Sequence, residues 1–268
     1  MHKRNLFGKV VLITGAAGGL GAALCHRCAQ AGVRIAAMDL DQAKLNMLVA
    51  ALPTGTLALA GNIADPDVCT GAVAKTLAHF GALDVLVNNA GISHRSLLTD
   101  TDPGVIRHVM EVNFFGAMQL TRAALPHLIA SRGVVAAISS VAGYAPLLGR
   151  TGYAASKHAL HGFFDSLRTE VEDMGVQVTL ICPSFIATGI GGSALGGSGV
   201  SATSPRITTG GESDPADIAQ QIFESIAQGK ALLLPDRTSR LAWWVNKLTP
   251  AFYARTMKRR VSAEFETK

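Results

Sequence analysis

Tyr153 and Lys157 are the residues whose types and spacing point most directly to chemistry. They lie four positions apart, so in a helix both side chains project from the same face. A free tyrosine has a pKa near ~10, too high for proton transfer at neutral pH, and a neighbouring ammonium lowers it. The pair can therefore serve as a general acid or base, although the same spacing also occurs in ordinary surface pairs.

Three further polar positions favour the catalytic interpretation of this pair. Ser140 directly follows an expected strand at residues 133–139, thirteen positions before the tyrosine. The run Asn-Asn-Ala-Gly at residues 88–91 closes another expected strand. Asn113 falls inside an expected long helix, where asparagine is a poor helix former and needs a reason to be present.

A glycine-rich turn at residues 14–21 has the sequence Thr-Gly-Ala-Ala-Gly-Gly-Leu-Gly and lies between an expected strand and an expected helix. Gly15 permits the tight turn, Gly19 lets the backbone approach a phosphate, and Gly21 lets the helix pack closely. The helix N-terminus then presents free N–H groups and a positive dipole to a pyrophosphate. Because the strand and helix are in place, the turn predicts a dinucleotide site.

Asp39 ends the second expected strand, eighteen positions after Gly21. A carboxylate there can bind both ribose hydroxyls of NAD and would repel the 2′-phosphate of NADP. Asp41 adds negative charge, and Arg34 lies too early in the strand to reach that phosphate. We therefore predict NAD over NADP; the alternative, which does not exclude this role, is that Asp39 caps the following helix.

The elements that must position these residues alternate along the chain. Expected strands are residues 10–14, 34–38, 56–60, 83–88, 133–139, 176–182 and 231–234, and expected helices are 20–31, 42–51, 67–79, 102–130, 152–174 and 215–228. The strands are continuous apolar runs, which is typical of a parallel sheet covered on both faces. The prediction is an α/β fold, a single-domain Rossmann-type doubly wound parallel sheet of about seven strands with helices on both faces.

Two segments extend this domain, which we expect to span residues 1–236. Residues 187–213 are rich in Gly, Ser and Thr and follow the carboxyl end of a strand, so a substrate lid is favoured over a linker. Residues 237–268 form a basic, apolar extension, expected to be helical, which holds Trp243 and Trp244. It could rest on an anionic membrane surface, but packing over the cleft or against another subunit is favoured.

Composition excludes several other classes of protein. The net charge of +5 is concentrated in the extension, and no nucleic-acid-binding motif accompanies it, so no nucleic-acid partner is expected. Cys25 and Cys28 have a C-x-x-C spacing, but without a second pair and within an expected helix we expect no metal or redox site. With few cysteines and no apolar run long enough to span a membrane, we expect a cytoplasmic protein, with peripheral membrane association as the alternative.

Taken together and in order, these motifs resemble the short-chain dehydrogenase/reductase family over about residues 7–235. The resemblance implies that Tyr153 protonates or deprotonates the substrate oxygen and that Ser140 holds that oxygen. It implies that Lys157 binds the nicotinamide ribose and lowers the pKa of Tyr153. Asn113 would hold a water that links Lys157 to solvent.

The resemblance also implies a set of cofactor contacts: Gly15, Ala17, Gly19, Leu20, Gly21, Asp39, Leu40, Asn62, Ile63, Asn89, Ala90, Gly91, Tyr153, Lys157, Pro183, Ile186 and Thr188. Asn62 and Ile63 stand where the family often has Asp-Val beside adenine, and Ile186 and Thr188 would contact the carboxamide. One departure is Ser184, which follows Pro183 where the family usually has glycine, so the turn near the nicotinamide is expected to differ.

The implied activity is hydride transfer between NAD(H) and a small-molecule secondary alcohol, ketone or aldehyde. The alternative is a non-catalytic NAD-binding or scaffolding member of the same fold. Apolar residues in the lid and extension indicate an apolar substrate such as a steroid, retinoid or fatty alcohol: Ile190, Leu195, Val200, Trp243 and Phe252. Family members are often homodimers or homotetramers built through the two long helices, here residues 102–130 and 152–174, whose interface could include His127, Phe163 and Phe164.

Overall fold

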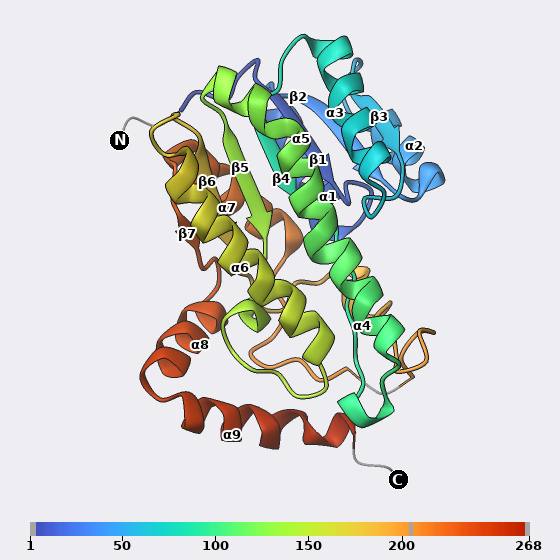
Figure 1. Cartoon of the computed structure of the whole chain (residues 1–268), viewed down its shortest axis with the longest axis vertical. Coiled ribbons are helices and arrows are strands. Elements are labelled where there is room, and N and C mark those ends of the chain that lie inside the picture. The colour runs from blue at the N-terminus through green and yellow to red at the C-terminus, as the bar shows by residue number, and fades with distance from the viewer. Residues whose placement is uncertain (1–3, 204–205, 266–268) are drawn as a thin grey trace.

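The computed structural model describes residues 4–203 and 206–265, and in them a seven-stranded sheet forms the centre of the fold (Figure 1). The strands are β1 (Val10–Thr14), β2 (Arg34–Asp39), β3 (Leu57–Ala60), β4 (Val85–Asn88), β5 (Val134–Ile138), β6 (Gln177–Ile181) and β7 (Leu232–Leu233). Their order is β3-β2-β1-β4-β5-β6-β7, and every neighbouring pair is parallel. The prediction of a doubly wound Rossmann-type sheet is confirmed.

Helices cover both faces of the sheet. They are α1 (Gly19–Gln30), α2 (Gln42–Ala50), α3 (Pro66–Phe80), α4 (Pro103–Met110), α5 (Gly116–Ser131), α6 (Thr151–Val171), α7 (Pro215–Gln228), α8 (Arg237–Leu248) and α9 (Pro250–Val261). One buried core lies between the sheet and α1, α2 and α7, and a second lies between the sheet and α3, α5 and α6. The apolar strands therefore bury side chains on both faces, as a parallel sheet requires.

Asp-Pro pairs begin three of these helices. Asp65, Asp102 and Asp214 are the N-caps of α3, α4 and α7, and each side chain accepts a hydrogen bond from a backbone N–H in the first turn. The proline that follows each cap occupies the first helical position, where its fixed φ fits and its missing N–H costs nothing.

The long helix expected at residues 102–130 is interrupted. Residues Glu111–Phe115 (η2) form a π-helical turn between α4 and α5, and Asn113 lies at its centre. The Asn113 side chain makes hydrogen bonds to the Ile92 backbone and to the Ser156 side chain. π-turns inside α-helices are frequent at functional sites, and here the turn accommodates the asparagine whose presence the helical pattern left unexplained.

Helices α8 and α9 run across the end of the molecule toward which the strands point (Figure 1). Tyr144 fixes α8 to the domain, because its hydroxyl donates to Ser239 O (2.7 Å) and its carbonyl accepts from Asn246 Nδ2 (2.7 Å). Its ring also packs edge-on against Trp243, with 4.9 Å between centroids. Residues of the described extension thus pack on the domain over the carboxyl ends of the strands.

Several apolar side chains of α8 and α9 are exposed to solvent. Leu241, Trp244, Leu248 and Phe252 are exposed, and basic side chains of the same helices lie among them in sequence. No helix in residues 4–203 and 206–265 is long and apolar enough to cross a membrane.

Candidate active site

One cavity of about 860 Å³ lies at the carboxyl ends of the strands and brings most of the predicted site residues together. Those that line it are Gly15, Gly19, Leu20, Asp39, Leu40, Asn62, Ile63, Asn89, Ala90, Gly91, Ser140, Tyr153, Lys157, Pro183, Ile186 and Thr188. Ala17, Gly21 and Asn113 do not line it. The glycine-rich turn and the tyrosine–lysine pair therefore open onto a single space.

Backbone conformation and close packing require glycine at three positions of the glycine-rich turn. Gly15 and Gly19 have φ values of 61° and 39°, in the left-handed region that favours glycine. A Cβ on Gly15 would lie 2.9 Å from Ala90 Cα, and one on Gly21 would overlap Gly15 O. The turn is thus packed against the end of β4 on one side and against the start of α1 on the other.

Asp39 is held ready at the end of β2. Its Oδ2 accepts from Ala17 N (2.9 Å) and its Oδ1 from Asp41 N (3.0 Å), so the carboxylate is joined to the glycine-rich turn. The N-cap of α2 is Asp41, whose side chain accepts from Lys44 N. The alternative in which Asp39 caps this helix is therefore wrong, and its carboxylate lines the cavity instead.

Asn89 holds the glycine-rich turn against β4. Its Nδ2 donates to Thr14 O (2.9 Å) and to Gly15 O (3.1 Å), and Thr14 Oγ1 accepts from the N–H groups of Asn89 and Ala90. The Asn89 side chain therefore stabilises the protein's own turn, so that contact with a ribose would be left to the backbone of residues 89–91.

The adenine end of the expected dinucleotide site is lined by Leu40, Asn62 and Ile63. Leu40 is exposed, whereas Ile63 is buried and packs against Gly116. Asn62 Oδ1 accepts from Ala64 N (3.0 Å), which leaves its amide N–H₂ group available to a ligand. This side chain can thus donate where the more usual aspartate would accept.

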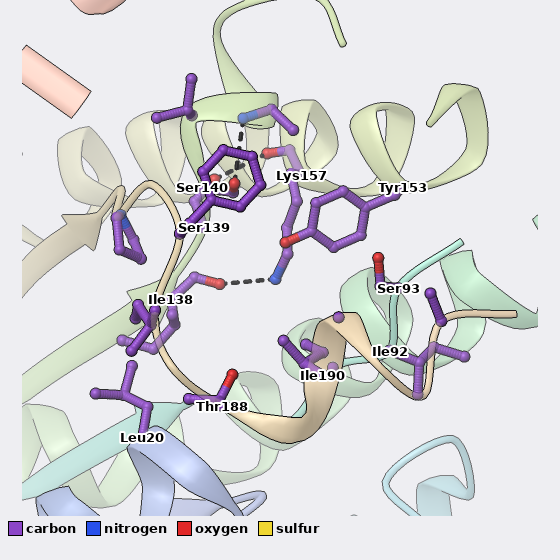
Figure 2. A pocket seen from close by; sticks show the side chains of 18 of the residues that line it. Leu20, Ile92, Ser93, Ile138, Ser139, Ser140, Tyr153, Lys157, Thr188 and Ile190 are labelled. Carbon is purple, nitrogen blue, oxygen red and sulfur yellow. Dashed lines mark hydrogen bonds between the residues drawn. The ribbon is translucent and has the colours of Figure 1, made fainter. Parts of the chain in front are cut away.

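Tyr153 and Lys157 point into the cavity from one face of α6, near the end of β5 (Figure 2). Lys157 is buried, its Nζ donates to Ile138 O (2.8 Å) and lies 5.7 Å from the centroid of the Tyr153 ring. Ser140 is the N-cap of the short helix η3 (Val141–Gly143), and its Oγ accepts from Ala142 N (3.2 Å). Three of the four predicted catalytic side chains therefore line the same part of the cavity, and Asn113 does not.

Burial dominates the acid–base properties of this pair. It raises the pKa of Tyr153, against the opposing influence of the Ser140 side chain and of the positive charges of Arg150 and Arg206. Burial also lowers the pKa of Lys157 to about 8. In the protein alone, desolvation outweighs nearby charge at Tyr153, and the Lys157 ammonium is directed at a backbone carbonyl. That Lys157 lowers the pKa of Tyr153 when cofactor is bound stays a prediction.

Asn113 makes three side-chain hydrogen bonds within the protein. Its Oδ1 accepts from Ile92 N (2.8 Å), and its Nδ2 donates to Ile92 O (3.0 Å) and Ser156 Oγ (2.9 Å). Both hydrogens of the amide are thus used within the protein, whereas its oxygen can still accept from a water, so the expected relay water stays a prediction. Asn113 therefore fixes the loop after β4 against α6, and so acts as a positioning residue beside Lys157.

The hydrogen bonds of Ser184 explain why a serine follows Pro183 where the family usually has glycine. Its N–H and its hydroxyl both donate to the carboxylate of Asp236, at 2.9 and 2.7 Å. Asp236 is in turn the N-cap of α8, in a capping box with Ser239. A glycine could not make the side-chain bond, so this serine couples the end of β6 to the start of α8.

Sequence reasoning overlooked a group of arginines. Arg95, Arg150, Arg206 and Arg260 all line the cavity, and the first two are buried. They come from separate loops and helices, and no local spacing relates them to one another. The signal that could have found Arg150 is its place three positions before Tyr153.

Some residues singled out from the sequence lie elsewhere. Of the apolar residues expected at the substrate, Ile190 and Phe252 line the cavity, whereas Leu195, Val200 and Trp243 do not. Phe164 is fully buried in the core, which excludes it from a subunit interface. Cys25 and Cys28 are buried in α1, where burial raises the pKa of both thiols, so neither is a ready thiolate. Within the described residues, no cluster of His, Cys, Asp and Glu could hold a metal ion.

Comparisons with known proteins agree with this geometry. A family model described as short chain dehydrogenase matches residues 9–195. The dehydrogenase/reductase SDR family protein 7-like of Anopheles gambiae is 39% identical over 97% of this chain and 85% of its own length. The dehydrogenase/reductase SDR family member 7B of Bos taurus is 37% identical over 97% of this chain and 83% of its own length.

Solved structures show the same fold. A short-chain dehydrogenase from Streptomyces avermitilis has a TM-score of 0.82 at 28% identity, over 97% of this chain and 99% of that one. A short-chain dehydrogenase/reductase from Burkholderia phymatum, solved in complex with NAD, has a TM-score of 0.80 at 24% identity, over 92% of this chain and 98% of that one. Since the family model spans more than half of the sequence and relatives above 30% identity cover nearly all of it, the chain belongs to the short-chain dehydrogenase/reductase family.

Proposed function

We propose that the protein transfers a hydride between NAD(H) and the carbonyl or alcohol carbon of a small-molecule substrate. Family membership already assigns the chain to oxidoreductases. The observation that carries the proposal is that Tyr153, Lys157 and Ser140 share one cavity with the glycine-rich turn and Asp39. When bound there, the nicotinamide supplies or accepts the hydride, and the residues of the chain handle the proton.

Each of the four predicted catalytic residues has a defined part in this proposal. Tyr153 gives a proton to the substrate oxygen in reduction, and removes it in oxidation. Ser140 binds the same oxygen and holds it in reach of the phenol. Lys157, fixed by Ile138 O, contributes donors toward the ribose, while Asn113 keeps the loop that faces Lys157 in place.

We propose further that residues 187–213 form the wall that closes over the substrate. Thr188, Ile190 and Ala194 from this segment line the cavity. Glycine-rich loops at the carboxyl ends of strands commonly close over ligands and exclude water. The apolar lining from α8 and α9 supports a substrate with a substantial apolar part.

Replacing Asp39 tests the preference for NAD. We expect the unsubstituted protein to bind NAD⁺ at least tenfold more tightly than NADP⁺, because an ionised carboxylate at this position repels a 2′-phosphate. Asp39→Asn keeps a side chain of the same shape and removes the charge, so the ratio of the two dissociation constants should narrow about tenfold, the ratio that ~1.4 kcal/mol represents. Isothermal titration with both cofactors measures it.

A matched control is Asp65→Asn, which removes an equal charge at the start of α3, after the neighbouring β3, and leaves a good N-cap for α3. The cofactor ratio should not change in this variant. Tighter binding of NADP⁺ by the unsubstituted protein would show that the interpretation of Asp39 is wrong. If NAD⁺ binds and no alcohol or ketone is turned over, the non-catalytic alternative is favoured.

Association with other surfaces is a separate proposal. Contact with an anionic membrane is supported by the basic residues of α8 and α9 and by their exposed apolar side chains Leu241, Trp244, Leu248 and Phe252. Separately, we propose that α4–α6 supply the faces of a homodimer or homotetramer. We expect the protein to float with vesicles of phosphatidylcholine and phosphatidylserine but not with phosphatidylcholine alone. Equal flotation with both, or with neither, would contradict the membrane proposal; light scattering without vesicles gives the number of subunits. Whether the protein is free or bound to a membrane surface, we propose that its catalytic residues face the reducing environment of the cytoplasm.

A further inference from the structure

Positive charge gathers on one side of the cavity. Arg95, Arg150, Arg206 and Arg260 line it, whereas Asp39 is the single carboxylate-bearing residue that lines it within the described part of the chain. Asp39 belongs to the end formed by the glycine-rich turn. The arginines belong to the end where the loop after β4, the start of α6, the segment before α7 and α9 meet.

Two of these guanidinium groups have protein partners. Arg150 Nη2 contacts Glu264 Oε2 at 2.6 Å, and Arg206 Nη2 contacts Glu212 Oε1 at 2.9 Å. Each of these charges is thus compensated by a carboxylate outside the cavity lining. Neither pair leaves an excess charge within the protein.

Arg95 has no such carboxylate among the described residues. Only 5% of it is exposed, its Nη1 and Nη2 reach Gly191 O and Ala202 O at 3.4 Å each, and its buried Nε lacks a partner. A buried charge without a counterion is costly, and two long bonds to carbonyls do not neutralise it. An arginine in this condition on a cavity wall is suited to bind an anion.

Arg206 lies beside Arg95. The backbone of Gly191 accepts from Arg95, and a Cβ built on Gly191 would overlap the Arg206 guanidinium. Burial lowers the pKa of Arg150, Glu264 opposes this shift, and the positive charges of Arg95 and Arg206 add to it, so both charges lie close enough to Arg150 to act on it. Two guanidinium groups against one glycine, here called the fork, can each donate hydrogen bonds to the oxygens of a carboxylate or phosphate.

This fork lies on the side of the cavity where proton transfer is proposed. Ser93, two positions before Arg95, and Ile190, next to Gly191, lie near the Tyr153 ring (Figure 2). The pKa of Tyr153 responds to Arg206. Beyond the fork the cavity is bordered by apolar side chains of α8 and α9, namely Leu241, Val245, Phe252 and Met257.

We propose that the substrate is amphiphilic: an anionic group, carboxylate or phosphate, binds Arg95 and Arg206, and an apolar chain lies along α8 and α9. The proposal rests on the proposed function, since it names the substrate class of the same site. Arg95 is the specificity-determining residue in it. The alternative origins of the same geometry are a contact with a cofactor phosphate and a purely structural tie between residues 95, 191 and 202.

The first experiment compares charged and neutral members of matched substrate pairs. NADH oxidation is followed with straight-chain keto carboxylates and their methyl esters, and with keto alkyl phosphates and the parent hydroxyketones. We expect kcat/KM to be at least tenfold higher for the anionic member of one series, and that series identifies the anion. In Arg95→Met this preference should disappear, while kcat/KM for the neutral member and the affinity for NAD⁺ change by less than threefold. Arg95→Lys should restore part of it, since it returns the charge but not the fork.

Arg255→Met is the matched control, because it removes one exposed arginine from α9 that does not line the cavity. It should leave the preference unchanged. Equal kcat/KM for anionic and neutral members in the unsubstituted protein would overturn the proposal. Two results with Arg95→Met would also overturn it. An equal loss of kcat/KM for the anionic and neutral members indicates a structural tie. A parallel loss of NAD⁺ affinity indicates a cofactor contact.

A binding measurement separates failure of this inference from failure of the proposed function. The full chain with NAD⁺ is titrated calorimetrically with decyl phosphate, decanoate and decanol. Tighter binding of an anionic ligand than of decanol, lost in Arg95→Met, supports the anion site even if no ketone is reduced, and then only the proposed function fails. Turnover of ketones together with equal binding of all three ligands leaves the proposed function standing and refutes the anion site.

Discussion

Tyr153→Phe is expected to lower kcat by about 10²–10⁴-fold, the usual contribution of a positioned general acid or base. The substitution removes only the hydroxyl, so the half-buried ring keeps its place near Lys157 and NAD⁺ affinity should stay within about threefold of its original value. Burial raises the pKa of this phenol, so the free protein holds it protonated at neutral pH. Stopped-flow measurement of NADH oxidation and titration of NAD⁺ give the two quantities.

Tyr144→Phe provides the matched control. Its hydroxyl donates to Ser239 O behind the cavity, so its loss should cost about 0.5–1.5 kcal/mol of stability and leave kcat within about twofold. A Tyr153→Phe enzyme that keeps more than a tenth of its kcat would remove this residue from the proton-transfer step. A simultaneous collapse of NAD⁺ binding would show that the ring, and not the hydroxyl, is what matters.

Glu264→Ala is expected to reduce the free energy of unfolding by about 3–5 kcal/mol, as when one partner of a buried ion pair is removed. The Glu264 side chain is fully buried and that of Arg150 is 9% exposed, so the variant would leave a guanidinium without a counterion. It would also leave Ile207 N without its acceptor. Such a loss is a large part of the ~5–15 kcal/mol that stabilises a typical domain. Urea denaturation monitored by circular dichroism measures the difference.

Two variants make this prediction specific. Asp165→Ala breaks an exposed pair with Arg168, side-chain exposure 54% and 27%, and should cost less than about 1 kcal/mol. The double variant Arg150→Met, Glu264→Leu replaces the buried pair by apolar side chains and should recover much of the stability lost in Glu264→Ala. A cost for Glu264→Ala no larger than that for Asp165→Ala would show that the buried pair is not essential to the fold.

The Arg150–Glu264 pair also gives the C-terminal extension a definite place in the molecule. Arg150 is the residue at the N-cap of α6, the helix that carries Tyr153, and Glu264 follows α9 in the short helix η5 (Ser262–Glu264). Glu264 in addition accepts from Ile207 in the segment before α7. One carboxylate therefore fastens the extension, the catalytic helix and the proposed lid together.

Local features of the sequence were sufficient to predict the parallel sheet and the position of the glycine-rich turn. Continuous apolar runs can be satisfied only by strands covered on both faces, and residues such as Gly15 are required wherever the backbone adopts a positive φ. The pair Tyr153 and Lys157 is equally local, because four positions on a helix define one face. The order of these motifs along the chain was enough to indicate the family.

The tertiary structure alone decided which side chains surround the glycine-rich turn and the pair Tyr153 and Lys157. Arg150 meets Glu264 across 114 positions, and Ser184 meets Asp236 across 52, so neither pairing has a spacing that a sequence pattern could reveal. The direction of the Tyr153 pKa shift depends on burial, which arises only when distant elements close around the phenol. The sequence by itself thus determined the fold and the residues able to do chemistry, because these follow from backbone geometry and hydrophobic pattern. Their electrostatic surroundings, including Arg95, which has no carboxylate partner among residues 4–203 and 206–265, follow from contacts between segments far apart in the chain.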